Sequence, residues 1–386
     1  MIDRPKYLRQ VQSQLDRYPV VAILGPRQCG KTTLANRYAD KFFNGPVTRF
    51  DLEDPVHLSL LESPKFVLEF LRGLVIIDEF QKSPGLLEVL RLLVDRKKNP
   101  ARFLILGSVS RELIMESSEA LAGRIAHIEL STFSLDEVGE NNIAKLWFSG
   151  GYPQSFLSEA EDAGAAWRKT YISTFLERDI PNLGFSIPPA ALRRFWMMLT
   201  HYHGQIVNYS EIGRSFGASD NTIRKYLGLL SSTFMIRQLP AWHEDIKKRQ
   251  VKAPKIYIRD SGVFHSLLGV DREEALWFHP KLGPSWEGFA LETIIRQYGA
   301  GPDECYFWSA YGRAELDLLI FNGIRRIGFE IKHTDSPKLT RSLKTACADL
   351  KIDELYIVYP GNERFLLEFG VEAVGLTSLH MESMTN

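Results

Sequence analysis

Residues 25–33 read Gly25-Pro26-Arg27-Gln28-Cys29-Gly30-Lys31-Thr32-Thr33 and directly follow five apolar residues, Val20–Leu24. The pattern is G-x-x-x-x-G-K-T between an expected strand and an expected helix, which is typical of a phosphate-binding loop. The glycines let the backbone curl so that several N–H groups face one point, at the positive end of the following helix. Lys31 would place its charge on the terminal phosphates, and Thr32 would offer its hydroxyl to Mg²⁺. The sequence therefore predicts that these nine residues bind ATP or GTP together with Mg²⁺.

A second signal lies one strand and one helix further along the chain. The apolar run Leu74–Ile77 ends in Asp78 and Glu79, as expected of a buried parallel strand with polar groups at its carboxyl end. We expect Asp78 to reach Mg²⁺, directly or through water, and Glu79 to act as general base on the attacking water. Two acids at a strand end are common, but after a phosphate-binding loop they are specific.

Two more apolar runs complete the expected sheet, which also includes a strand at 46–51 and helices at 34–41 and 56–71. The strand at 101–108 ends in Ser108, and Arg124 precedes the strand at 125–130. Ser108 either hydrogen-bonds the attacking water or caps the next helix, a frequent role of serine. The residues leave both interpretations open.

This order of strands resembles that of the AAA+ ATPases. The resemblance implies that Arg124 is presented to the nucleotide of a neighbouring subunit in a homo-oligomer, such as a hexameric ring, so that hydrolysis depends on assembly. The alternative is a surface or lid arginine. The resemblance to the AAA+ ATPases also implies a helical lid over residues 131–184, with an amphipathic helix at 167–179. There Arg178 is either a nucleotide sensor or an ion-pair partner of Glu177 or Asp179.

Residues 185–255 look like a winged helix-turn-helix. A short helix at 208–216 and a second helix from Asn221 flank the turn Gly217–Ser219, and Arg224 and Lys225 are expected to point outward as in a DNA-reading helix. The densest basic run of the chain, residues 247–255, follows and is expected to contact phosphates. Its charged candidates are Lys247, Lys248, Arg249 and Lys252. The alternative is a protein-interaction module with a solvated basic linker.

Residues 256–386 contain a third set of candidate site residues. Glu330 and Lys332 are two positions apart on an expected strand and therefore share a face. Together with Asp317, at the polar turn where a strand begins, they resemble the PD-(D/E)xK nuclease core, and Glu287 on the preceding helix matches an additional acid of that core. The resemblance implies that the carboxylates hold a divalent ion and that the lysine acts on the attacking water. The alternatives are an ion pair on one strand, or a fold that binds DNA without cleaving it.

Composition narrows the class of protein only in part. The 386 residues suggest two to four compact units of roughly 100–200 residues each. The 47 basic and 47 acidic residues cancel, so a nucleic-acid surface would have to be local. The 3 cysteines are far apart and fit a reducing cytoplasm, and no apolar run approaches the roughly 18–20 residues of a membrane span. We therefore expect a cytoplasmic protein with no membrane segment.

The whole chain resembles a prokaryotic family of AAA+ ATPases with a carboxyl-terminal domain of unknown function. The motifs that carry this resemblance are Gly25–Thr33, Ile77–Gln81, Leu121–Arg124, Gly150–Pro153, Glu177–Ile180, Asp260–Gly262 and Phe329–Lys332. It implies an α/β protein with a P-loop AAA+ core at 1–130, a lid at 131–184, a winged helix at 185–255 and a nuclease-like domain at 256–386.

Three functions follow as hypotheses. The first is an oligomeric ATPase that binds or remodels DNA, such as branched DNA (Holliday junctions), through its carboxyl-terminal half. The second is an ATP-gated, metal-dependent nuclease. The third is a signalling or protein-remodelling ATPase whose carboxyl-terminal domains are docking surfaces, which the balanced charge favours.

Overall fold

The structure is a computed structural model that describes residues 2–83, 85–96, 101–110, 121, 123–243, 251–310 and 314–379. The chain forms two compact units. Unit 1 comprises Met1–Phe133 and Gly228–Met235, and unit 2 comprises Ser134–Leu227 and Ile236–Asn386. Among the described residues, every helix is too short or too polar to span a bilayer.

Unit 1 is built on a parallel five-stranded sheet with the order β2-β3-β4-β1-β5. The strands are β1 (Val20–Leu24), β2 (Val47–Asp51), β3 (Gly73–Asp78), β4 (Ala101–Gly107) and β5 (Ile125–Glu129). The strands expected from the apolar runs are therefore present. All five residues of β1 are buried, because β1 lies between β4 and β5.

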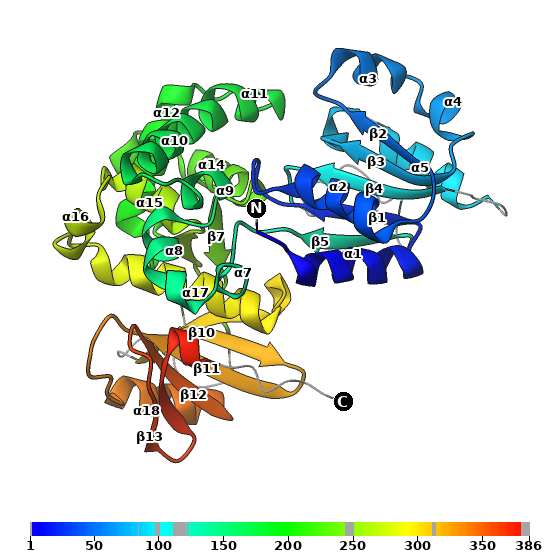
Figure 1. Ribbon diagram of the computed structural model, residues 1–386. Coiled ribbons are helices and arrows are strands. Elements are labelled where there is room, and N and C mark those ends of the chain that lie inside the picture. The colour runs from blue at the N-terminus through cyan, green and yellow to red at the C-terminus, as the bar shows by residue number, and fades with distance from the viewer. Residues whose placement is uncertain are drawn as a thin grey trace. The chain divides into compact units, whose positions relative to one another are not determined.

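The helices of unit 1 are α1 (Pro5–Arg17), α2 (Lys31–Phe42), α3 (Pro55–Leu60), α4 (Pro64–Leu68) and α5 (Leu86–Val94), with a 3₁₀ turn η1 at Phe80–Lys82. Helices α1 and α2 pack together on the sheet (Figure 1). The buried side of α1 consists of Leu8, Val11 and Leu15, whose spacing of three and four places them on one helical face. These leucines and valine share one core with Val21 and Ile23 of β1.

The helix predicted over residues 56–71 is wrong as a single element. Two short helices, α3 and α4, take its place, and Pro64 is the first residue of α4. Proline lacks a backbone N–H and is favoured at the first turn of a helix, so it starts a helix more readily than it continues one.

The amino-terminal part of unit 2 is helical. Its helices are α7 (Leu135–Val138), α8 (Ile143–Ser149), α9 (Pro153–Phe156), α10 (Glu161–Thr174), α11 (Ile180–Asn182), α12 (Pro189–Leu199), α13 (Tyr209–Phe216) and α14 (Asp220–Ser232), the last of which continues into unit 1. A π-helix at Phe175–Asp179 joins α10 to α11. The helix expected at 167–179 therefore begins earlier, at Glu161, and changes its hydrogen-bonding pattern after Thr174.

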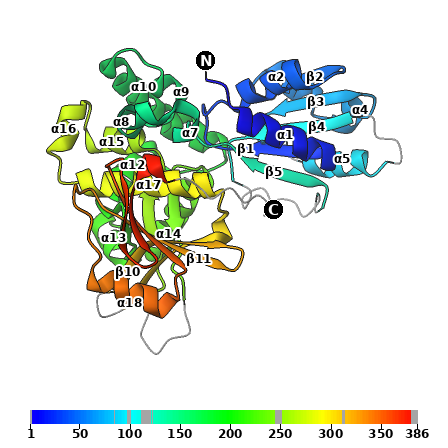
Figure 2. The ribbon, with the colours of Figure 1, turned by 60° about the horizontal axis from the view of Figure 1, so that its bottom comes forward.

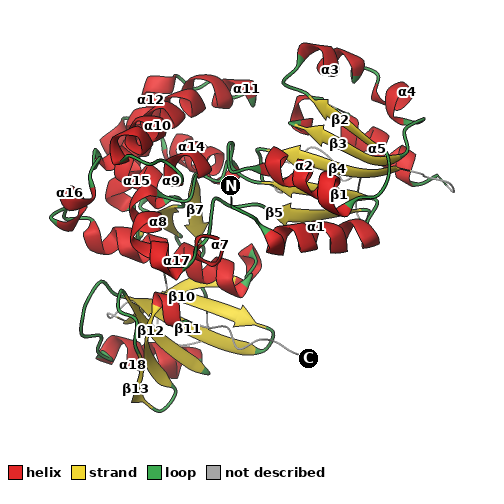
Figure 3. Ribbon diagram, in the orientation of Figure 1, coloured by secondary structure: helices red, strands yellow, loops and turns green. Residues whose placement is uncertain are grey.

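The rest of unit 2 contains two sheets (yellow in Figure 3). A three-stranded antiparallel sheet has the order β6-β8-β7, with β6 (Gln205–Ile206), β7 (Ile236–Leu239) and β8 (Lys255–Ile258). A mixed six-stranded sheet has the order β13-β14-β12-β11-β10-β9. Its strands are β9 (Cys305–Ala310), β10 (Ala314–Asn322), β11 (Arg325–Ile331), β12 (Glu354–Tyr359), β13 (Arg364–Glu368) and β14 (Val371–Gly375).

Helices cover both sides of the six-stranded sheet. The remaining helices are α15 (Ser261–Leu268), α16 (Glu273–Trp277), α17 (Leu282–Tyr298) and α18 (Arg341–Leu350). Figure 2 shows α17 and α18 on opposite sides of β10 and β11. Leu343, Ala346 and Leu350 of α18 pack against Leu316 and Leu319 of β10. Asp317, expected where a polar turn passes into a strand, is the fourth residue of β10, next to a register irregularity between Leu316 and Leu319.

Candidate functional site

The phosphate-binding loop lies between the carboxyl end of β1 and α2. Gly30 caps α2 with φ 103°, and Gln28 has φ 62°, so both are in left-handed conformations. Glycine adopts this conformation without steric cost. At Gly25, a Cβ atom would lie 2.0 Å from the carbonyl oxygen of Leu130, so no larger residue fits. The two glycines of the motif are therefore required by backbone geometry.

Lys31 is the first residue of α2 and is buried. Its Nζ donates hydrogen bonds to the carbonyl oxygens of Gly25 and Pro26, at 3.0 Å each, and to the hydroxyl of Ser108 at 3.1 Å. The ammonium is thus held inside the curl of the loop, where the backbone N–H groups of a phosphate-binding loop converge.

Thr32 and Asp78 form the candidate metal site. The Thr32 hydroxyl lies 2.5 Å from the Oδ2 atom of Asp78. Burial raises the pKa of Asp78, while the hydrogen bond from Thr32 lowers it and the charge of Glu79 raises it further. Hydroxyl and carboxylate oxygens are the hard ligands that Mg²⁺ prefers, usually with water and substrate phosphates completing the shell. The donor set therefore fits Mg²⁺.

Glu79 lies at the end of the same strand and is held from two sides. Ser108, after β4, donates a hydrogen bond of 2.9 Å to Oε1 of Glu79, and the Gln81 amide donates to Oε2. The backbone of Glu79 has φ 52°, which is uncommon for a residue with a side chain and often found at functional sites. The structure thus connects Lys31, Ser108 and Glu79 in one chain of hydrogen bonds.

The remaining residues of the loop shape it. Arg27 forms an ion pair with Glu53. Cys29 is fully buried and donates its Sγ–H to the Leu130 carbonyl oxygen at 3.3 Å, and burial raises its thiol pKa. Thr33 is exposed on α2. Cys29 therefore fills space beneath the loop.

Sequence reasoning missed Arg4, whose side chain holds the phosphate-binding loop by hydrogen bonds. Its guanidinium is buried and donates to the carbonyl oxygens of Cys29, at 3.2 Å, and of Ser131, at 3.0 Å. The guanidinium also lies over the rings of Tyr7 and Phe133. The only signal in the sequence is an arginine directly before Pro5 at a helix start, which is too common to be specific.

The two arginines expected from the AAA+ resemblance are placed as follows. The carbonyl oxygen of Arg124 accepts a hydrogen bond of 3.3 Å from the backbone N–H of Val20, at the amino end of β1, and its side chain pairs with Asp95. Arg124 thus lies at the amino-terminal ends of the strands, whereas Lys31 lies beyond the carboxyl-terminal end of β1. Arg178 is exposed in the π-helix of unit 2.

The four nuclease-like residues come together in unit 2. The β10–β11 ladder ends at the pair Leu318 and Phe329, which places Asp317 beside Glu330. Asp317 also accepts a hydrogen bond of 3.0 Å from the Ile331 N–H, and Lys332 lies 2.7 Å from Glu330 Oε1. The other carboxylate oxygen of Glu330 is buried and has no hydrogen-bond partner among the described residues.

Two further residues of this cluster come from β8. Tyr257 was missed by sequence reasoning, and Lys255 was wrongly included in the basic run 247–255 expected to contact phosphates, because its side chain is buried. Lys255 Nζ lies 3.1 Å from Asp317, and the Tyr257 hydroxyl donates a hydrogen bond of 2.7 Å to Glu287. In the sequence, the two residues stand two positions apart in an apolar stretch, which predicts that they share one face of a strand. Nothing in the sequence indicates which residues they contact.

The acids of the cluster have strongly shifted pKa values. Burial and the nearby charge of Asp317 raise the pKa of Glu287 to about 7 and that of Glu330 to about 8. Burial also acts to raise the pKa of Asp317, but the ammonium groups of Lys255 and Lys332 outweigh it, and the pKa is lowered. Such opposed shifts are frequent where carboxylates share a site.

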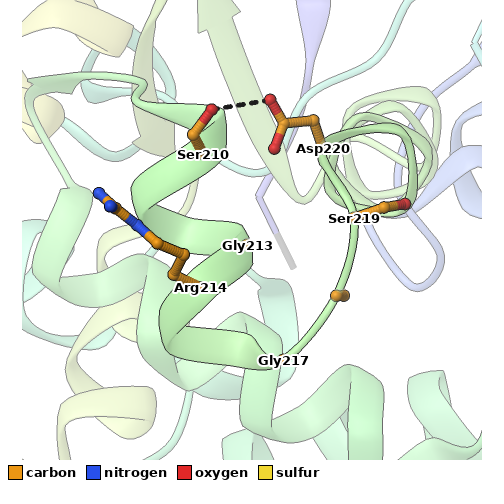
Figure 4. A pocket seen from close by; sticks show the side chains of 7 residues that line it. Ser210, Gly213, Arg214, Gly217, Ser219 and Asp220 are labelled. Atoms are coloured by element: carbon orange, nitrogen blue, oxygen red, sulfur yellow. Dashed lines mark hydrogen bonds between the residues drawn. The ribbon is translucent and has the colours of Figure 1, made fainter.

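The candidate DNA-binding residues are only partly described. Arg224 and Lys225 are exposed on α14, and the Arg224 guanidinium stacks over Tyr209, 3.6 Å from the ring centre. At the turn between α13 and α14, Ser210 donates a hydrogen bond of 2.8 Å to Asp220 beside a hollow of about 540 Å³ (Figure 4). Lys252 is exposed, whereas Lys247, Lys248 and Arg249 lie outside the described residues.

Comparison with protein families identifies the first unit. A model described as an AAA domain matches residues 17–139, and models of two domains of unknown function match 140–274 and 282–379. Unit 1 therefore contains an AAA-type ATPase domain, which implies nucleotide binding, typically of Mg²⁺-ATP.

Two mycobacterial proteins are similar over nearly the whole chain. They are the uncharacterised proteins Rv2008c of Mycobacterium tuberculosis and Mb2031c of Mycobacterium bovis, each 46% identical over 97% of this chain and 84% of its own length. The chain belongs to the same family as these proteins.

Solved structures show a weaker likeness. The Walker-type ATPase PABY2304 of Pyrococcus abyssi is 17% identical, with a TM-score of 0.46, over 69% of this chain and 96% of that one. RuvB of Thermotoga maritima is 17% identical, with a TM-score of 0.33, over 62% and 90%. Both scores are low, so neither likeness assigns a role to a residue of this chain.

Proposed function

We propose that unit 1 hydrolyses ATP at the carboxyl edge of its sheet, with Glu79 as general base. The observation that carries the proposal is the chain of hydrogen bonds from Lys31 through Ser108 to Glu79, which ties the phosphate-binding lysine to the base. In hydrolysis, water attacks the γ-phosphorus, its proton passes to Glu79, and the bond to the ADP oxygen breaks. Bound Mg²⁺ would neutralise charge on the phosphate oxygens.

Lys31 and Thr32 would change partners when ATP binds. The ammonium of Lys31 would exchange its bonds to the carbonyl oxygens of Gly25 and Pro26 for bonds to phosphate oxygens, which carry more charge. Thr32 and Asp78 would hold the ion, directly or through water, between them.

The proposal is tested by separating binding from turnover. Glu79→Gln should bind a fluorescent ATP analogue as the parent does and lower single-turnover phosphate release by about 10²–10⁴-fold, the usual contribution of a general base. Lys31→Ala should lose both binding and turnover. Exposed Glu62 offers a matched control, Glu62→Gln. Full turnover by Glu79→Gln would exclude Glu79 as the base.

We also propose that Arg124 completes the site of a neighbouring copy. Arg124 adjoins the first residue of β1, whereas Lys31 follows the last; five strand residues span about 17 Å, so Arg124 is remote from its own nucleotide. Mixing inactive Lys31→Ala with inactive Arg124→Ala should restore part of the activity, because some sites then combine an intact loop with an intact arginine. A mixture that stays inactive, although the two variants co-assemble, would contradict the proposal.

We propose further that ATP turnover is coupled to DNA, such as branched DNA, through unit 2. The exposed Arg224 and Lys225 on α14 support this, because basic residues on an exposed helix can contact phosphates. Turnover should rise with single-stranded, duplex or four-way DNA, and less so in the Arg224→Gln/Lys225→Gln variant. The control pair is Lys65→Gln/Arg72→Gln, exposed in unit 1. If no DNA changes turnover, the protein-remodelling hypothesis takes its place.

A metal-dependent DNA nuclease is the second candidate function, favoured by the clustering of Asp317, Glu330 and Lys332. The unpartnered oxygen of Glu330 is a suitable ligand for a divalent ion, and Asp317 would be a second ligand once the Lys255 ammonium had moved away from it. Lys332 would act on the water that attacks the phosphate. Labelled DNA should be cleaved with Mg²⁺ or Mn²⁺ by the parent and not by Asp317→Ala. Equal or absent cleavage in both would exclude the nuclease.

A further inference from the structure

The ammonium of Lys255 is surrounded by three carboxylates of unit 2. Its Nζ atom lies 2.6 Å from Glu315 Oε1, 3.1 Å from Asp317 Oδ1 and 3.8 Å from Glu287 Oε1. The Lys255 side chain is only 3% exposed. A buried lysine is rare unless it is paired, so these acids are what keep the charge in place.

Strand pairing fixes the backbone position of Lys255. Lys255 belongs to β8, which is paired to β6 on one side and to β7 on the other. Two positions further along the strand, Tyr257 donates its hydroxyl to the same Glu287 oxygen that lies near Lys255. Lys255 is therefore part of the packed structure of the cluster.

A divalent ion in this cluster would need the same oxygens. Mg²⁺, Mn²⁺ and Ca²⁺ bind carboxylate oxygens at about 2.0–2.6 Å, and a lysine ammonium bound to the same oxygens would repel the ion at short range. Among the described residues, no group of three or more histidine, cysteine or acidic side chains is arranged to hold a metal ion, and one buried oxygen of Glu330 has no hydrogen-bond partner.

We propose that Lys255 is the resident cation of this cluster and excludes a divalent metal ion from Glu287, Glu315 and Asp317. Removal of its charge converts the cluster into a divalent-cation site. This inference concerns the site of the second candidate function and rests on its metal ligands, but it does not require cleavage. A nuclease reaction at this site would require the Lys255 ammonium to move aside first.

The test is a titration of the full chain with Mn²⁺, without nucleotide and without DNA. The parent and all variants in this titration carry the additional substitution Thr32→Ala, which removes one expected metal ligand from the ATP site. Lys255→Met should bind one Mn²⁺ per chain at least about tenfold more tightly than the parent, because the repelling charge is gone. Its unfolding temperature, followed by tryptophan fluorescence, should rise with Mn²⁺ relative to EDTA, whereas that of the parent should not. All 7 tryptophans belong to unit 2, so this signal reports that unit.

Two controls identify the site. Adding Asp317→Asn to Lys255→Met should abolish the gain in affinity. Lys332→Met removes the same charge from a lysine whose side chain is 52% exposed and contacts Glu330, and it should gain less affinity. Equal gains in Lys255→Met and Lys332→Met would overturn the proposal, since a general change in charge would explain both.

Folding of the variant is itself a readout. Lys255→Met and Lys255→Gln leave three acids without their cation, so either variant folding only with Mn²⁺ would support the proposal. Variants that bind no tighter than the parent, or that stay unfolded with Mn²⁺ as well as with EDTA, would overturn it. Absent cleavage by a variant that binds Mn²⁺ would reject the nuclease alone and leave the proposal standing.

Discussion

The hydroxyl of Ser108 donates a hydrogen bond of 2.9 Å to the carboxylate of Glu79. The same oxygen accepts a hydrogen bond of 3.1 Å from Lys31. Ser108 therefore connects the end of β4 to the end of β3 and to the first turn of α2. Under the proposed function, an exchange of Lys31's partners for a phosphate would reach Glu79 through one atom, the Ser108 hydroxyl oxygen.

Ser108→Ala should lower kcat by about tenfold, the effect expected from losing hydrogen bonds to two charged groups, with a smaller change in KM. Steady-state phosphate release measures both constants. Ser108→Thr retains the hydroxyl and should restore most of the loss. An unchanged kcat in Ser108→Ala would show that Ser108 does not position Glu79.

Arg4→Ala should destabilise unit 1 by about 2–4 kcal/mol, because it leaves the buried carbonyl oxygens of Cys29 and Ser131 without a charged donor. Scanning calorimetry should show the transition of unit 1 at a lower temperature, while the tryptophan signal of unit 2 stays in place. Affinity for ATP should also fall, since Cys29 belongs to the phosphate-binding loop.

Arg9→Ala is the matched control for Arg4→Ala, because Arg9 is an exposed arginine of α1, the helix that Arg4 precedes. The role given to Arg4 would be wrong if both variants unfolded at the temperature of the parent.

The sheet of unit 1 was predictable because its central strands β1, β3 and β4 are largely apolar runs and the loop has a fixed spacing. The backbone geometry of Gly25 and Gly30 explains why that spacing is specific. Local signals failed where a proline interrupted a helical pattern, at Pro64. Apolar patterning gives the existence of an element more reliably than its ends.

The cluster of unit 2 was predictable only in part. The alternation of Glu330 and Lys332 predicted that they share one strand face; β11 ends at Ile331, so Lys332 lies just beyond the strand, and the two side chains form an ion pair. Lys255 could not be connected to Asp317, because 62 residues separate them and neither motif implies the other. Buried ion pairs between distant segments depend on tertiary packing, which a single sequence does not reveal.

His265 should make the stability of unit 2 depend on pH. It is fully buried; its Nδ1–H donates a hydrogen bond of 2.9 Å to the Phe148 carbonyl oxygen, and its Nε2 accepts one of 2.6 Å from the Ser285 hydroxyl. Burial lowers the pKa of His265 to about 4, from 6.5. Between pH 6.5 and pH 4, the His265 ring is protonated in the unfolded chain and neutral in the folded chain. Lowering the pH therefore favours unfolding.

The free energy of unfolding should therefore fall as pH decreases from 6.5 toward 4, by up to about 1.4 kcal/mol per pH unit from this group. His203, whose pKa burial lowers to about 3, adds to the same trend.

His265→Asn should be less stable than the parent at pH 7, because it loses buried hydrogen bonds. The difference should shrink by up to about 2 kcal/mol by pH 5, because asparagine takes up no proton. Urea unfolding followed by tryptophan fluorescence measures it, with exposed His201→Asn as control. A constant difference between parent and variant from pH 7 to pH 5 would show that His265 is not buried in its neutral form.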